Sequence, residues 1–145
     1  MNGWVLIRFL HILSAATWVG GQILLTTLLL PLVRRRLPAE FQAALTTAIG
    51  RRFGLFTLAV FLPVQVGTGI GLAIEHGVTW SSLAQPGYGR ILTAKLALFA
   101  AVLAVSGLHG WAHGSGRRAL ARGLALTSLI GSVGIILLAA DLASH

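Results

Sequence analysis

The chain has 145 residues, of which 56% are hydrophobic and only 10% are charged. A soluble domain has about 25% charged residues, so this composition excludes an ordinary soluble domain and predicts a lipid bilayer as the main partner. The formal net charge is +8, but the basic residues lie between apolar runs, as in membrane-protein loops, so we expect no nucleic-acid partner. The chain has no cysteine, which excludes disulfides and thiolate metal sites.

Four stretches are long and apolar enough to cross a membrane, since a spanning helix needs about 20 mostly apolar residues. We expect spans at residues 3–30, 53–75, 88–113 and 119–141. Pro31 and the arginines at 34–36 end the first span, and the mildly amphipathic stretch 38–50 predicts a short interfacial helix. The predicted fold is all-α: one transmembrane domain over residues 1–145, an integral membrane four-helix bundle.

The basic residues predict the orientation of the spans, because cytoplasmic loops are enriched in lysine and arginine. The loop after the first span carries five arginines and the loop after the third carries three, whereas the middle loop has only Arg90. We therefore expect the N-terminus, the middle loop and the C-terminus to lie outside a bacterial-type cytoplasmic (inner) membrane.

Glycine pairs four residues apart recur along the chain, and this spacing lets helices approach closely. The pairs are Gly50/Gly54, Gly67/Gly71 and Gly110/Gly114. They predict either close packing within the bundle or a homodimer formed through small-residue helix faces.

The polar residues of each span fall on one helix face, at about 100° per residue. Polar groups inside a membrane usually face the bundle interior, so we expect the four polar faces to converge. By depth these residues form two layers. The outer layer contains Arg8, His11, Glu75, His76, Lys95, Asp141 and His145, and the inner layer contains Gln22, His109 and His113.

The outer layer combines two of the three acidic residues with three of the five histidines. Imidazole and carboxylate groups together form divalent-metal sites, and without cysteine or internal methionine such a site favours Cu(II) or Zn(II) over Cu(I). The residues that we expect at the metal are His11, Glu75, His76, Asp141 and His145. In the alternative interpretation, Glu75 and Asp141 neutralise Arg8 and Lys95 at the membrane interface.

His109 and His113 are four residues apart and lie on one face of the third span. The pair suits a metal site or supplies one haem axial ligand; alternatively, it is an interfacial histidine pair. Two axial ligands must lie at similar depth. We therefore expect His11 to share a haem with His76 or His145 rather than with His109.

Several motifs resemble the copper resistance protein D (CopD) family of membrane proteins. The run Arg8-Phe9-Leu10-His11, followed by Trp18-Val19-Gly20-Gly21, resembles the first helix of that family. Arg51-Arg52-Phe53 with Gly67-Thr68-Gly69 resembles its second helix, and Tyr88-Gly89-Arg90 with Lys95-Leu96 resembles the start of its third. The likeness covers roughly residues 5–104 and implies periplasmic copper handling, or copper uptake across the inner membrane.

The chain also resembles the HemJ-type protoporphyrinogen oxidases, which bind haem b. This likeness rests on His11, Trp18, Gly20, Lys95 and His109. It implies a haem-dependent oxidoreductase. The residues expected at a haem are His11, His109, His113, Arg8, Trp18 and Lys95.

Three hypotheses for function follow. The first is a copper-handling membrane protein, the second a haem b protein for electron transfer or porphyrinogen oxidation, and the third a non-catalytic membrane assembly subunit. The sequence contains no nucleophile triad, phosphate-binding loop or paired catalytic carboxylates, which argues against a hydrolase and assigns no catalytic residue.

Overall fold

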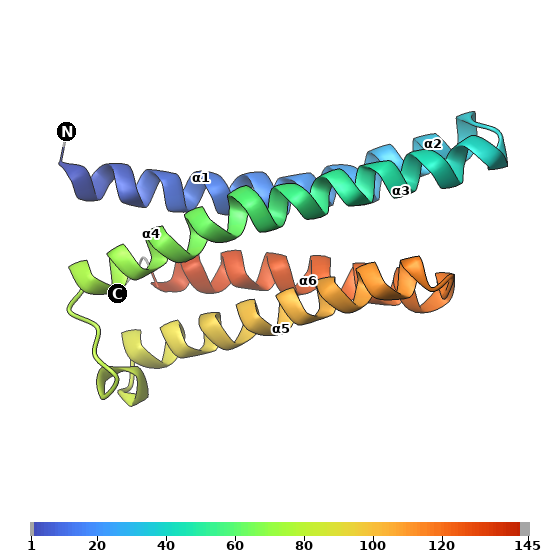
Figure 1. Cartoon of the computed structure of the whole chain (residues 1–145). Helices are drawn as coiled ribbons and strands as arrows, with labels where there is room; N and C mark the ends of the chain where they lie inside the picture. Colours follow the sequence, from blue (N-terminus) through green and yellow to red (C-terminus); the bar gives the residue numbers. More distant parts are fainter. Residues whose placement is uncertain (1, 143–145) are drawn as a thin grey trace. The chain divides into compact units, whose positions relative to one another are not determined.

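The computed structural model describes residues 2–142, and within this range the chain forms helices and connecting turns without a strand (Figure 1). Four helical segments are long and apolar enough to cross a membrane: Gly3–Arg36, Ala39–Glu75, Tyr88–Gly114 and Arg118–Leu142. The predicted all-α class with four long apolar helices is confirmed, and the chain is a multi-pass membrane protein.

The chain forms two compact units, Met1–His76 and Gly77–His145. Each unit is a pair of antiparallel helices (Figure 1). We call them the first hairpin, built from helices α1 to α4, and the second hairpin, built from α5 and α6. Each hairpin has its own interior contacts. The single transmembrane domain over residues 1–145 stays a prediction.

In the first hairpin, the leading helical segment continues through Pro31. It consists of α1 (Gly3–Leu24), a π-helical turn η1 (Leu25–Leu29) and α2 (Leu30–Arg36). Proline has no N–H and its ring displaces the carbonyl four residues before it. The wider π-helical turn, which ends two residues before Pro31, accommodates that carbonyl. The helix therefore extends six residues beyond the predicted end at residue 30.

The second helical segment repeats this arrangement. It consists of α3 (Ala39–Phe56), a π-helical turn η2 (Thr57–Phe61) and α4 (Leu62–Glu75), with Pro63 as the second residue of α4. The predicted interfacial helix at residues 38–50 is therefore not a separate element, because it forms the first part of α3. At about 1.5 Å per residue, the 34 and 37 residues of these two segments extend about 51 and 55 Å, beyond the hydrocarbon thickness of about 30 Å.

The connection between the two segments is short. Pro38 disfavours a helical conformation in the residue before it, and Leu37 has an extended backbone. The Gln42 side-chain amide donates to the carbonyls of Arg34, at 3.1 Å, and Leu37, at 2.7 Å. These bonds satisfy carbonyls that the end of α2 leaves without a helical partner.

In the second hairpin, small residues set the distance between α5 (Tyr88–Gly114) and α6 (Arg118–Leu142). A Cβ atom on Gly131 would lie 2.5 Å from Cγ2 of Val102, so α5 packs directly against this glycine. One turn away, the hydroxyls of Ser106 and Ser128 are hydrogen-bonded at 2.7 Å. The turn between the helices contains Gly116 at a φ of 72°, a conformation that favours glycine.

Of the predicted small-residue pairs, Gly71 is the member that packs within its hairpin: a Cβ there would lie 3.4 Å from Ile7. A Cβ at Gly50, Gly54 or Gly67 would meet no atom of the first hairpin within 4 Å. The homodimer stays a prediction.

Large apolar side chains remain exposed on both hairpins. Leu28 and Leu58 on the first are 63% and 67% exposed, and Ile130 and Leu137 on the second are 71% and 70% exposed. In water such surfaces are unfavourable, whereas in a bilayer they contact lipid tails of the same polarity. The exposed leucines and isoleucines therefore fit contact with the lipid bilayer.

Candidate functional site

His11 lies at the centre of a polar network between α1 and α4 in the first hairpin. Its Nδ1 atom is 2.8 Å from the Thr68 hydroxyl, and its Nε2 atom is 3.0 Å from the side-chain nitrogen of Gln65. The polar faces predicted for the first two spans therefore meet here. Both ring nitrogens of His11 are therefore hydrogen-bonded to side chains of α4.

The directions of these bonds assign the tautomer of His11. The Thr68 hydroxyl donates to the carbonyl of Val64, at 2.5 Å, and has no second hydrogen to give. It must therefore accept from Nδ1–H of His11, which leaves Nε2 as the acceptor of a Gln65 N–H. The network is satisfied by a neutral imidazole.

Two further residues complete the network. The Ser14 hydroxyl lies 2.6 Å from Oε1 of Gln65 and 3.1 Å from the carbonyl of His11, and it donates its single hydrogen in the shorter contact, to Gln65. Gln65 is only 8% exposed. On α4, a Cβ on Gly69 would lie 3.4 Å from Cε1 of His11, so the absence of a side chain at Gly69 leaves room for the ring. Thr68 and Gly69, which belong to one of the sequence motifs, therefore seat the His11 ring on α4.

This geometry limits what His11 can do as a ligand. A metal ion or haem iron bound at Nε2 would have to replace the hydrogen bond from Gln65, and Gln65 would then need another partner in an apolar environment. In the arrangement observed, His11 joins α1 to α4. Its predicted roles as metal and haem ligand stay predictions.

Trp18 lies in the core of the first hairpin. Its ring stacks on Phe61 with centroids 4.5 Å apart and planes at 7°, and the two side chains are 2% and 1% exposed. The indole N–H donates to the Thr57 hydroxyl at 3.0 Å, and that hydroxyl donates to the carbonyl of Phe53 at 2.9 Å. Trp18 therefore packs α1 against the π-helical turn η2.

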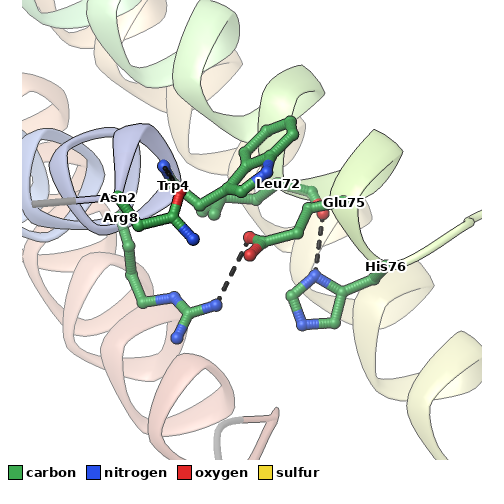
Figure 2. A network of polar contacts seen from close by, with 6 residues as sticks. All are labelled: Asn2, Trp4, Arg8, Leu72, Glu75 and His76. Atoms are coloured by element: carbon green, nitrogen blue, oxygen red, sulfur yellow. Dashed lines mark hydrogen bonds and ion pairs between the residues drawn. The ribbon is translucent and has the colours of Figure 1, made fainter.

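Two outer-layer residues of the first hairpin, Arg8 and Glu75, form an ion pair (Figure 2). Arg8 donates from Nη2 to Oε2 of Glu75 at 3.3 Å, and the two side chains are 55% and 24% exposed. His76 donates from Nδ1 to the carbonyl of Leu72 at 2.8 Å, at the end of α4. The pairing of Glu75 with Arg8 agrees with the interpretation in which this acid neutralises a basic residue at the interface.

Four of the five residues predicted to bind a metal lie within the described part of the chain: His11, Glu75, His76 and Asp141. Across residues 2–142, no group of three or more histidine, aspartate or glutamate side chains could hold a metal ion. Asp141 lies in the last turn of α6, in the second hairpin. His145 lies outside the described residues. The five-residue outer metal site stays a prediction.

His109 links the two helices of the second hairpin. Its Nδ1 donates to the backbone carbonyl of Ala121 on α6 at 2.8 Å. This bond assigns the tautomer in which Nε2 carries the lone pair. Histidines that bind metals commonly donate their other ring N–H to a carbonyl or carboxylate in this way, so His109 is oriented as metal-binding histidines are.

His113 lies one turn further along α5. The His109 and His113 rings have centroids 6.4 Å apart and planes at 54°, and His113 is exposed while His109 is half-buried. An exposed side chain can change rotamer, so both imidazoles can approach one ligand. Elsewhere on α5, Lys95, which we expect near a haem, is half-buried.

Sequence reasoning did not assign site roles to Ser14, Gln65 or Thr57. A signal for Gln65 was present, because a primary amide inside a span is costly without a partner. Ser14 and Thr57 carried a weaker signal, since a hydroxyl in a helix can bond to its own backbone.

The sequence was also compared with known proteins. No family model matches it, and neither a curated protein nor a solved structure shows significant similarity.

Proposed function

We propose that this chain is a copper-handling protein of a bacterial-type cytoplasmic membrane, in which His109 and His113 hold the metal. The observation that carries the proposal is the hydrogen bond from Nδ1 of His109 to the Ala121 carbonyl. This bond orients Nε2 as a ligand and fixes the ring against α6. His113 supplies a second imidazole one turn away.

The donor chemistry supports copper in its divalent state. Two histidines four residues apart on a helix are a recurring metal-binding arrangement. Imidazole nitrogen suits Cu(II), whereas Cu(I) favours sulfur ligands, and this chain has no cysteine and a single methionine. Because His113 is exposed and His109 is half-buried, water would supply the remaining ligands of a bound ion. The CopD-like motifs support copper as the metal, although they lie within residues 5–104 and so do not include His109 or His113.

The proposed orientation follows from the arginines, with both termini outside and the turn between α5 and α6 in the cytoplasm. His113 is the penultimate residue of α5, so the proposed metal site lies at the inner face. The first hairpin then serves as a scaffold, with His11 as the link between its helices. Because the two hairpins have different proposed roles, variants of His11 and variants of His109 and His113 should differ in their effect on copper binding.

The experiment is copper loading of the purified full-length chain in detergent, followed by removal of weakly bound metal and elemental analysis. We expect about one copper per chain, and nitrogen hyperfine structure from imidazole in the electron paramagnetic resonance spectrum. The double variant His109→Ala/His113→Ala should lose most of the copper, and His76→Ala, also a histidine at a helix end, should retain it. Unchanged copper in the double variant would refute the assignment.

Variants of His11 separate this proposal from the outer-site hypothesis. With copper at His109 and His113, His11→Leu should retain copper in chains that remain folded. Loss of copper from folded His11→Leu, with retention in the double variant, would move the metal to the first hairpin.

A second candidate function is haem b binding, and the same bond of His109 favours it. An oriented Nε2 suits an axial haem ligand, and Arg117, Arg118 and Arg122 follow closely in the sequence. Arginines pair well with carboxylates such as haem propionates. With haem bound, an electron-transfer or oxidoreductase activity becomes available.

An absorption spectrum of the same preparation distinguishes these functions. A Soret band that is lost in His109→Ala would establish haem. A preparation that stays colourless after haem addition would reject it. If the protein binds neither copper nor haem, the remaining proposal is a non-catalytic assembly subunit.

A further inference from the structure

The first hairpin contains an open groove of about 370 Å³ at the junction of α1 and η1 with α3. This volume lies within the range of about 300–1,000 Å³ typical of small-molecule pockets. Its walls are apolar except for one arginine. They are formed by Gly21, Leu24 and Leu25 from one segment and by Ile49, Arg52, Phe53 and Phe56 from the other.

Gly21 and Phe53 form the point where the two walls meet. A Cβ on Gly21 would lie 2.8 Å from Cε2 of Phe53, so the phenyl ring lies directly against the glycine backbone. Beside this contact the groove is apolar, with the leucines on one side and Ile49 and Phe56 on the other. A hydrocarbon chain fits this groove because it has no hydrogen-bonding groups that would need a partner.

The groove spans the level where a membrane changes from hydrocarbon to headgroups. At about 1.5 Å per residue, Gly21 lies about 27 Å along the helix from Gly3, close to the hydrocarbon thickness of about 30 Å. On the other segment, Arg52 lies about 35 Å from Glu75 by the same measure. By the same measure Phe56 lies about 29 Å and Ile49 about 39 Å from Glu75. Phe56 therefore lies at the hydrocarbon end of the groove, and Arg52 and Ile49 lie at its headgroup end.

The charge around Arg52 has one dominant sign. This end of the hairpin carries Arg51 and the three arginines at residues 34–36, against the single acid Glu40. Basic pockets between membrane helices attract anionic lipid headgroups, and the guanidinium group matches the geometry of phosphate. The positive charge at this end of the hairpin therefore favours the binding of an anionic amphiphile.

We propose that this groove binds one acyl chain of an anionic phospholipid, with the headgroup phosphate at Arg52. The proposal does not depend on copper or haem, because none of the groove residues belongs to either predicted site. It predicts a lipid that remains with the protein through purification.

Native mass spectrometry of the full-length chain tests this proposal. Phosphatidylglycerol and phosphatidylcholine with identical acyl chains are added at equal concentration, and the bound fraction of each is measured. We expect phosphatidylglycerol to exceed phosphatidylcholine at least threefold. Arg52→Gln should bring the ratio close to one, whereas Arg51→Gln, which removes the same charge from the neighbouring exposed residue outside the groove, should keep it.

A second variant tests the acyl-chain position. Ile49→Trp places a large ring in the groove and should reduce the bound fraction of both lipids at least threefold. Equal binding of the two lipids by the unaltered chain would overturn the proposal. Equal effects of Arg52→Gln and Arg51→Gln would also overturn it, and this arginine comparison decides the matter even if Ile49→Trp does not fold.

Discussion

The hydrogen bond between His11 and Gln65 can be tested by a double-mutant cycle on the free energy of unfolding. His11→Leu removes two side-chain bonds to α4, to Thr68 and Gln65. Gln65→Leu also removes two, to His11 and Ser14. The double variant removes three bonds, because the two single changes share one.

The magnitude follows from this shared bond. Hydrogen bonds between helices in membranes contribute about 0.6 kcal/mol on average and up to about 1.7 kcal/mol. We expect each single variant to lose about 1–2 kcal/mol on that scale. The double variant should lose less than the two single losses added together, by a coupling energy of roughly 0.6–1.7 kcal/mol.

The assay is reversible unfolding in mixed micelles, followed by circular dichroism as the fraction of denaturing detergent rises. The control pair is His11→Leu with Gln42→Leu, since Gln42 bonds to the carbonyls of Arg34 and Leu37 at the other end of the hairpin. These two changes should be additive within about 0.5 kcal/mol. An additive result for His11 and Gln65 as well would refute the assigned bond and tautomer.

Two further predictions use the same assay. Gly131→Ala should destabilise the second hairpin by about 1–3 kcal/mol relative to Gly123→Ala. A Cβ at Gly131 would lie 2.5 Å from buried Val102, whereas a Cβ at Gly123 would meet nothing within 4 Å. Equal stabilities of the two variants would contradict this packing. Arg8→Gln should change stability by less than about 1 kcal/mol, because its ion pair with Glu75 is partly exposed. A larger loss at high salt would show that Arg8 has another role.

The sequence motifs anticipated parts of the candidate site, but not its bonding. His11 was expected in the outer polar layer and Thr68 belonged to a motif of the second span, and the structure brings them to 2.8 Å. The bond of His109 to Ala121 could not be anticipated, because a backbone carbonyl carries no sequence signal. Nor could the stacking of Trp18 on Phe61, which depends on how closely two helices approach.

Composition and helical period alone determined that this chain belongs in a bilayer as four long apolar helices, since both are local properties that need no partner. The helix ends were harder to predict from the sequence, because Pro31 and Pro63 follow π-helical turns that let the helices continue. Only the tertiary structure decided which polar groups bond. A histidine has two nitrogens and several possible partners, and the choice depends on the distance and rotation of the opposing helix. For that reason the structure makes His11 a link between α1 and α4, and His109 a link between α5 and α6.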